Sequence, residues 1–177
     1  MKTSRWTRAT PLLLSVLLFG ACASAPEPHP AQRKGDDYFA RDSYHLALPY
    51  YQEAAAARPE DEALQERLTE TREALLAHRR EQARGALDAA EPEAALAAAI
   101  QVQAELGADD PEVGALTKEI GQRVREHAAS AERAGDYQKA VRIFEALLRD
   151  LPEHARGGHS ELARLQKLWV GQLIDRA

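Results

Sequence analysis

The feature that most constrains this chain is a helical pattern that occurs three times. Its clearest copy lies in residues 135–152, where a Gly-Asp turn signal opens an amphipathic run and a proline closes it. Ala140, Phe144 and Leu147 recur there at i, i+4 and i+7, which is one face of an α-helix. This mixture of small and large side chains suits close contact with a neighbouring helix. The equivalent positions of the two earlier copies are Ala47, Tyr51 and Ala54, and then Ala95, Ala99 and Val102.

The stretch before each of these runs supplies the rest of a helical hairpin. Gly35 and Tyr38 precede Ala47, and the corresponding small residues of the later copies are Ala83, Ala86, Ala128 and Ala131. The set Gly35, Tyr38, Ala47, Tyr51, Ala54 and Pro59 resembles the tetratricopeptide repeat (TPR). The resemblance covers residues 31–152 as an architecture. It implies an all-α solenoid of helical hairpins whose first helices line a concave groove.

The spacing of the copies departs from that of the TPR family, whose period is about 34 residues. Ala47, Ala95 and Ala140 lie 48 and 45 residues apart. At about 3.6 residues per turn, the surplus amounts to whole helical turns, which lengthen a helix without turning its apolar stripe away from the core. We therefore expect two elongated first helices, at residues 61–89 and 111–134. The expected stripe of the first consists of Leu64, Leu68, Leu75 and Leu76.

Local signals mark several helix boundaries. Asp110 and Pro111 predict a helix start, with the aspartate as cap and the proline at the first helical position. Pro49 lies inside an expected helix, so that helix either begins near His45 or kinks. Beyond Pro152, Ser160 can cap a last helix that closes the solenoid, giving about seven helices in all. The apolar residues of that last helix are Leu162, Leu165, Leu168, Trp169, Leu173 and Ile174, and the alternative is that Trp169 and Leu173 form an exposed face for a partner.

The amino-terminal residues predict export and lipidation. A basic start is followed by an apolar run that is too short to span a bilayer, which indicates a signal peptide at residues 1–21. The sequence Gly20-Ala21-Cys22 resembles the bacterial lipobox, and Cys22 is the only cysteine of the chain. The resemblance implies acylation of Cys22, with residues 22–30 as a proline-containing tether before a folded domain at residues 31–177. The alternative is an ordinary secreted protein with one free thiol.

Charge and motif content exclude several functions. The net charge is -5, and it becomes -8 once Lys2, Arg5 and Arg8 leave with the signal peptide, so nucleic acid is excluded as a partner. No phosphate-binding glycine loop or catalytic constellation is present, and we expect neither an enzyme nor a cofactor. His154 and His159, with neighbouring glutamates, fit no recognised pattern of metal ligands. We therefore expect no metal.

A binding surface is the remaining candidate for a functional site. Transferred through the TPR resemblance, the groove positions are Gln32, Asp36 and Phe39, then Arg80, Arg84 and Leu87, and finally Gln122, Arg125, Glu132 and Arg133. Four arginines in an acidic chain predict an acidic peptide or chain terminus as ligand, because the guanidinium group matches a carboxylate. The alternative is that these residues are solvated helix faces, paired with nearby glutamates. The sequence contains no asparagine, so it cannot carry the asparagine-containing carboxylate clamp of chaperone-binding relatives.

These observations predict a lipid-anchored scaffold for protein–protein interaction in the bacterial envelope. The residue after the lipobox, Ala23, favours the outer membrane over the inner one by resemblance to sorting signals. TPR lipoproteins serve in the assembly of outer-membrane, secretion or motility complexes, and no motif singles out one of these systems. The alternative is a structural lipoprotein whose long helices associate with copies of themselves, without a peptide groove. The oligomeric state stays open.

Overall fold

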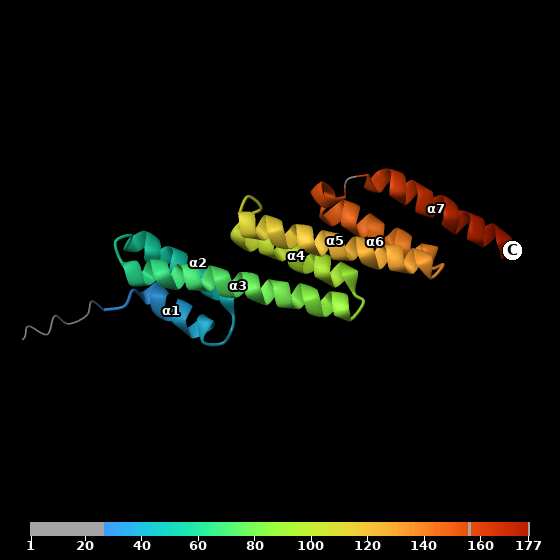
Figure 1. The fold of residues 1–177 in the computed structure, drawn as a ribbon. Coiled ribbons are helices and arrows are strands. Elements are labelled where there is room, and N and C mark those ends of the chain that lie inside the picture. Colours follow the sequence, from blue (N-terminus) through green and yellow to red (C-terminus); the bar gives the residue numbers. More distant parts are fainter. Residues whose placement is uncertain (1–26, 156, 177) are drawn as a thin grey trace, which may run out of the picture.

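The computed structural model describes residues 27–155 and 157–176, and these residues form seven α-helices, one 3-10 turn and no β-strand (Figure 1). Cys22, the expected signal peptide and the start of the tether lie outside the described residues. The elements are α1 (Pro30–Phe39), α2 (Tyr44–Ala57), α3 (Glu62–Asp88), α4 (Pro92–Leu106), α5 (Pro111–Arg133), α6 (Tyr137–Asp150), η1 (Pro152–His154) and α7 (Gly158–Asp175).

The helices pack in consecutive hairpins. The most extensive contacts join α1 to α2, α3 to α4, and α5 to α6, while α2–α3 and α4–α5 contacts link each hairpin to the next. The last helix, α7, packs on α6, at the end of the molecule away from α1 (Figure 1). The expected all-α hairpin solenoid is confirmed. The two elongated first helices are also confirmed, because α3 and α5 have 27 and 23 residues against 15 and 14 in their partners α4 and α6.

Aspartate side chains fix the starts of three helices. The Asp110 carboxylate accepts hydrogen bonds from the backbone N–H groups of Glu112 at 2.9 Å and Val113 at 3.3 Å, as the sequence predicts. Asp61 caps α3 and Asp136 caps α6 in the same way. These caps set the lengths of the helices on which the surfaces described below are built.

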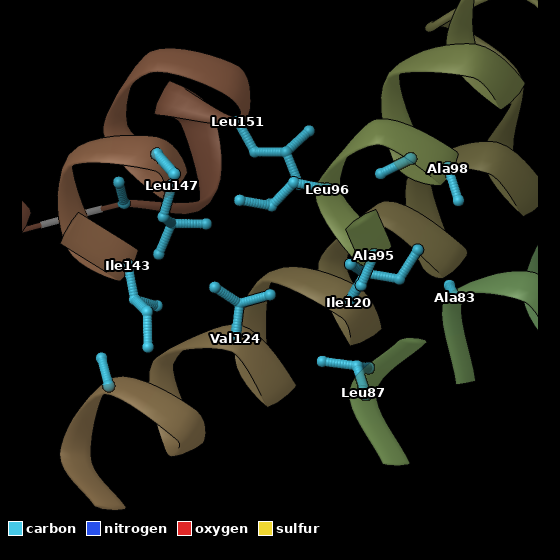
Figure 2. Close-up of a cluster of buried hydrophobic side chains, with 14 of the residues drawn as sticks. Ala83, Leu87, Ala95, Leu96, Ala98, Ile120, Val124, Ile143, Leu147 and Leu151 are labelled. Carbon is cyan, nitrogen blue, oxygen red and sulfur yellow. The ribbon is translucent and has the colours of Figure 1, made fainter. Parts of the chain in front are cut away.

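Small residues in the main core allow close contact between neighbouring helices. Figure 2 shows side chains from α3, α4, α5 and α6 converging there, with Leu96, Ile120 and Leu147 among them. Ala95 and Ala140, the small residues of the repeated pattern, have no exposed surface. Because the interior is close-packed, larger side chains at these two positions would have to displace a neighbouring helix.

The first hairpin has a core of its own. The ring of fully buried Tyr51 lies against Gly35, where an added Cβ would come within 2.9 Å of it, so the residue at 35 must lack a side chain. The Tyr51 hydroxyl donates a hydrogen bond of 2.6 Å to the Asp36 carboxylate. Desolvation and this carboxylate both raise the pKa of Tyr51. The phenol therefore stays a neutral donor that ties α2 to α1.

The long helix α3 buries different faces in its two halves. Its first half buries Leu64 against Ala31 of α1 and Ala54 of α2, and also buries Thr71 and Leu75, whereas its second half buries Ala83 and Leu87 in the main core. At about 100° per residue, these two sets lie on different sides of the helix. The prediction that whole-turn insertions keep one apolar stripe on the core is therefore wrong for α3. The stripe moves by one position, from Leu75 to Leu76, where the neighbours change.

Of two expected boundaries, one is confirmed and one needs correction. Helix α2 begins at Tyr44, next to the expected start near His45, and continues through Pro49, which is exposed, so the carbonyl of His45 that loses its hydrogen bond lies at the surface. Helix α7 begins at Gly158 rather than after Ser160, whose hydroxyl instead donates to the carbonyl of Gly157. Gly157 has a φ of 72°, a left-handed conformation that suits glycine and ends the preceding turn.

Candidate functional site

The first group of predicted groove residues lies inside the amino-terminal hairpin region. Asp36 accepts from Tyr51, as above, and lies 3.8 Å from the Arg67 guanidinium of α3. The same guanidinium lies over the ring of Phe39, 4.8 Å from its centroid. The side chains of Asp36 and Phe39 therefore hold α1 against α2 and α3. Gln32, the third member of this group, is half-buried.

The second predicted group lies between α3 and α5. Arg80, Arg84 and buried Leu87 line a narrow hollow of about 40 Å³, whose other wall includes Glu119 and Arg123 of α5. The Arg84 guanidinium pairs with Glu81, three residues earlier, at 2.8 Å. The hollow itself is small, and Arg80 and Arg84 are exposed at its rim.

The third predicted group borders a larger recess. Gln122 and Arg125 of α5, with Lys118, form one wall of a recess of about 500 Å³, and Glu153 and His154 of η1 form the other. The three α5 residues follow at i, i+4 and i+7, so they share one face of that helix. This face points away from the buried stripe that includes Ile120 and Val124. We call these five residues the α5–η1 recess.

The 3-10 turn of the recess is fixed by two small contacts with α5. Gly121 has no side chain, and an added Cβ would lie 3.0 Å from the Cβ of His154. The His154 ring lies on the other side against buried Thr117, with Nε2 at 3.2 Å from the threonine hydroxyl oxygen. The hydroxyl donates to the carbonyl of Gly114, so it can accept a hydrogen bond from an N–H on Nε2. This arrangement gives η1 one position against α5.

A second hollow, of about 360 Å³, continues from the recess past Arg125 toward the start of α7. Glu132 lies in this hollow, but it forms two hydrogen bonds of 2.7 Å with the Arg164 guanidinium of α7. The same guanidinium binds Glu161, and its hydrogen bonds lower the pKa values of both glutamates. Glu132 therefore links α5 to α7 through this ion pair and has little freedom to contact a ligand. Arg133, at the end of α5, is exposed.

The structure does not bring the predicted groove residues into one groove. Phe39 contacts Arg67 of α3, whereas Arg84 lies 17 residues further along that helix, about 25 Å away and on another side of it. Gln122 and Arg125 lie on a different face of α5 from Glu119 and Arg123, which line the hollow beside Arg80. Of the predicted residues, these two from α5 line the largest space.

The charges of the recess favour an anion. Among the described residues, Lys118 and Arg125 form no ion pair, and Glu153 is the one acidic side chain of the lining. Glu153 lies 3.5 Å from His154 Nε2. Two unpaired cations beside an amide and an imidazole are suited to carboxylate binding. In the part of the chain that the structure describes, no group of three potential metal ligands is found, and no helix is long and apolar enough to cross a membrane.

Three residues of the recess were not predicted from the sequence. Lys118 was recognisable by its spacing from Gln122 and Arg125, because residues four and seven apart share a helix face. Glu153 and His154 carried no such signal, since their positions depend on how the chain turns after Pro152. They reach this position because Gly121 has no side chain, which lets His154 pack closely against α5.

Comparisons with known proteins give no match: no family model, no curated protein and no solved structure matches this chain. The recess is therefore interpreted from its own side chains.

The role of Gly121 can be tested against a second glycine of the same helix. Gly114→Ala meets no atom within 4 Å, so it should raise the free energy of unfolding by up to about 1 kcal/mol through helix propensity. Gly121→Ala has the same propensity gain but must push His154 away, so it should be less stable than Gly114→Ala. Urea unfolding of both variants measures the difference. Equal stabilities, with an unchanged NMR signal of the His154 ring, would contradict the proposed contact.

Proposed function

We propose that this chain is a TPR-like scaffold that binds an acidic segment of another protein and is held in the bacterial envelope by a lipid on Cys22. The observation that carries the proposal is the α5–η1 recess, where Lys118 and Arg125 are unpaired on the exposed face of a hairpin solenoid. Solenoids of this kind bind partners along extended surfaces of successive helices. The acidic whole chain makes this local group of cations distinctive.

The spacing of the cations defines the segment that fits. Lys118 and Arg125 are seven residues apart on α5, so their Cα atoms lie about 10 Å apart along the helix axis. Two carboxylates three residues apart in an extended polyproline II segment share one face of that segment and are separated by about 9 Å, close to the same distance. The Gln122 amide lies between the two cations and can bind the backbone of such a chain, donating through its NH2 group and accepting through its oxygen. An acidic pair in an extended segment, or an acidic residue near a carboxyl terminus, meets these requirements.

The lipid anchor rests on the sequence. Cys22 follows Gly20-Ala21 at the end of a short apolar run, and it is the one cysteine of the chain. The first helix begins at Pro30, eight residues after Cys22, a length that spans at most about 25–30 Å when extended. The anchored domain therefore stays close to the membrane. A residue other than aspartate after the cysteine favours the outer membrane, facing the periplasm.

A self-associating structural lipoprotein is the second candidate function. The observation that favours it is the exposure of large apolar side chains on α7, with Val170 and Leu173 each 52% exposed. In this candidate the copies themselves are the partners, and no separate peptide ligand is needed.

The anchor is tested by detergent-phase partitioning of the protein expressed in a Gram-negative bacterium. The wild-type chain should enter the detergent phase because its cysteine is acylated. Cys22→Ser should abolish acylation and leave the uncleaved signal peptide in place, which shows as a larger apparent mass. Ala25→Ser, three residues away, serves as the control and should behave as wild type. A wild-type protein that stays in the aqueous phase would show that the lipoprotein interpretation is wrong.

The recess is tested with a fluorescent peptide that carries glutamates three residues apart. Lys118→Glu with Arg125→Glu should weaken its binding by about tenfold or more, because two attractive contacts become repulsive. The loss should be largest at low ionic strength, since salt screens exposed charges. Circular dichroism should show an unchanged fold because both side chains lie at the surface.

Two double variants with the same change of net charge serve as controls for that result. Lys139→Glu with Arg142→Glu changes the net charge equally on α6, and Arg80→Glu with Arg84→Glu changes it in the narrow hollow between α3 and α5. Equal losses in all three variants would mean that net charge alone attracts the peptide. A loss confined to the variant at Arg80 and Arg84 would move the site to that hollow.

A further inference from the structure

The outer face of α7 is not covered by any other element that the structure describes. Its inner face packs on the core through Leu162, Leu165 and Trp169, and the Gln172 amide donates to the Gly135 carbonyl at 3.0 Å. Trp169 and Leu173 therefore do not form one exposed face, because Trp169 is partly buried against the core while Leu173 is exposed. At about 100° per residue, Gly171 lies about a third of a turn around the helix from Leu165 and Gln172, on the edge of the outer face nearest Tyr137 of α6.

On the outer face, a cation and an anion lie at equal distances along the helix on either side of Gly171. Lys167 lies four residues before this glycine and Asp175 four residues after it, both exposed and on the same helix row. Leu168, Val170 and Ile174 flank the row, and they are 37%, 52% and 69% exposed. No atom lies within 4 Å of the position that a Cβ of Gly171 would occupy. The row is therefore cation, glycine, anion, with apolar side chains beside it.

We propose that this face binds a second copy of the chain, with the two α7 helices antiparallel and crossing at Gly171. Reversal of direction places Lys167 of each copy opposite Asp175 of the other, so one two-fold axis forms two ion pairs. Such an interface is self-complementary and closed, which is the usual geometry of a homodimer. A parallel pair would instead oppose like charges.

The glycine and its apolar neighbours suit a close crossing. Helices commonly cross at about −50° along rows of residues four apart, with axes 8–10 Å apart. Gly171 has no side chain to keep the axes apart at the crossing point. Val170 and Ile174 then lie beside their counterparts from the other copy, and their exposed apolar surface is removed from water.

The neighbouring charges do not oppose this pairing. Arg164 lies one turn before Lys167, but its guanidinium is bound to Glu132 and Glu161. A hollow of about 510 Å³ separates the row from Tyr137 of α6 and is lined by Lys167, Leu168, Gly171 and Asp175, so it provides space beside the row for a side chain of the other copy. One helix face is a small interface, so the dimer is expected to be weak and to form at high local concentration.

Sedimentation equilibrium of the full chain in mild detergent tests the proposal. The wild-type protein should dimerise reversibly in a concentration series that reaches about 0.5 mM, as a small interface predicts. Lys167→Glu alone and Asp175→Lys alone should each weaken dimerisation by about tenfold or more, because like charges then face one another twice. An equimolar mixture of the two variants should dimerise within about threefold of wild type, since both ion pairs return, one in its native form and one with reversed sign.

Arg142→Glu and Glu53→Lys, exposed residues on α6 and α2, are the controls for the two changes of net charge and should leave the dimer intact. A wild-type chain that stays monomeric at the highest concentration would overturn the proposal, and so would one that stays monomeric while binding phospholipid vesicles through this face. A mixture that fails to restore dimerisation would overturn the antiparallel pairing. Because none of these variants touches the α5–η1 recess, the result is independent of peptide binding.

Discussion

The whole arrangement depends on α3, one continuous helix that serves two cores. Between the two buried faces of α3, polar side chains of this helix meet carboxylates of other elements. The Arg79 guanidinium is almost buried, and it donates to Glu105 of α4 through Nε at 2.9 Å and to Gln82 at 2.8 Å. Arg72 pairs with Asp110, the cap of α5, at 2.6 Å. A buried guanidinium without its carboxylate would cost about 3–5 kcal/mol, so Glu105 holds α4 in one position against α3.

The position of the recess follows from this constraint. With α4 fixed on α3, the stripe that includes Leu116, Ile120 and Val124 orients α5 toward the core, which leaves the face of Lys118 and Arg125 outward. The absence of a side chain at Gly121 then admits η1. Buried Leu165 and the Arg164–Glu132 pair fix α7 beyond it. Each surface that can bind a partner is thus set by tertiary contacts with helices earlier in the chain.

The sequence predicted the hairpins because their signals are local. The repeated Ala140 pattern, the Asp110 cap and the long run from 61 to 89 each depend on residues a few positions apart. The rotation between the two faces of α3 was not predictable in this way. Counting whole turns assumes the same neighbours along the helix, whereas α1 and α2 cover Leu64 and α4 and α5 cover Leu87 from different sides.

The same limit explains the division of the predicted groove. Transfer by repeat spacing assumes that every first helix presents its equivalent face to one surface. The changed face of α3 separates Phe39 from Arg84, and the partner of Arg125 in the recess, His154, comes from a turn with no repeat position. The sequence could indicate Gln122 and Arg125 as outward residues, but the second wall of their recess depends on a tertiary contact.

Amide hydrogen exchange along α3 tests most directly whether one helix joins the two cores. If α3 is continuous and packed in both halves, the amides from about Leu68 to Leu87 should be protected together and should exchange through one cooperative opening with a common free energy. The segment from Thr71 to Arg79, where the buried face changes, should be as protected as its flanks. Rapid exchange confined to that segment, with the two flanks opening at different free energies, would contradict the account, because it would mean that the two cores are separate units joined by a break in α3.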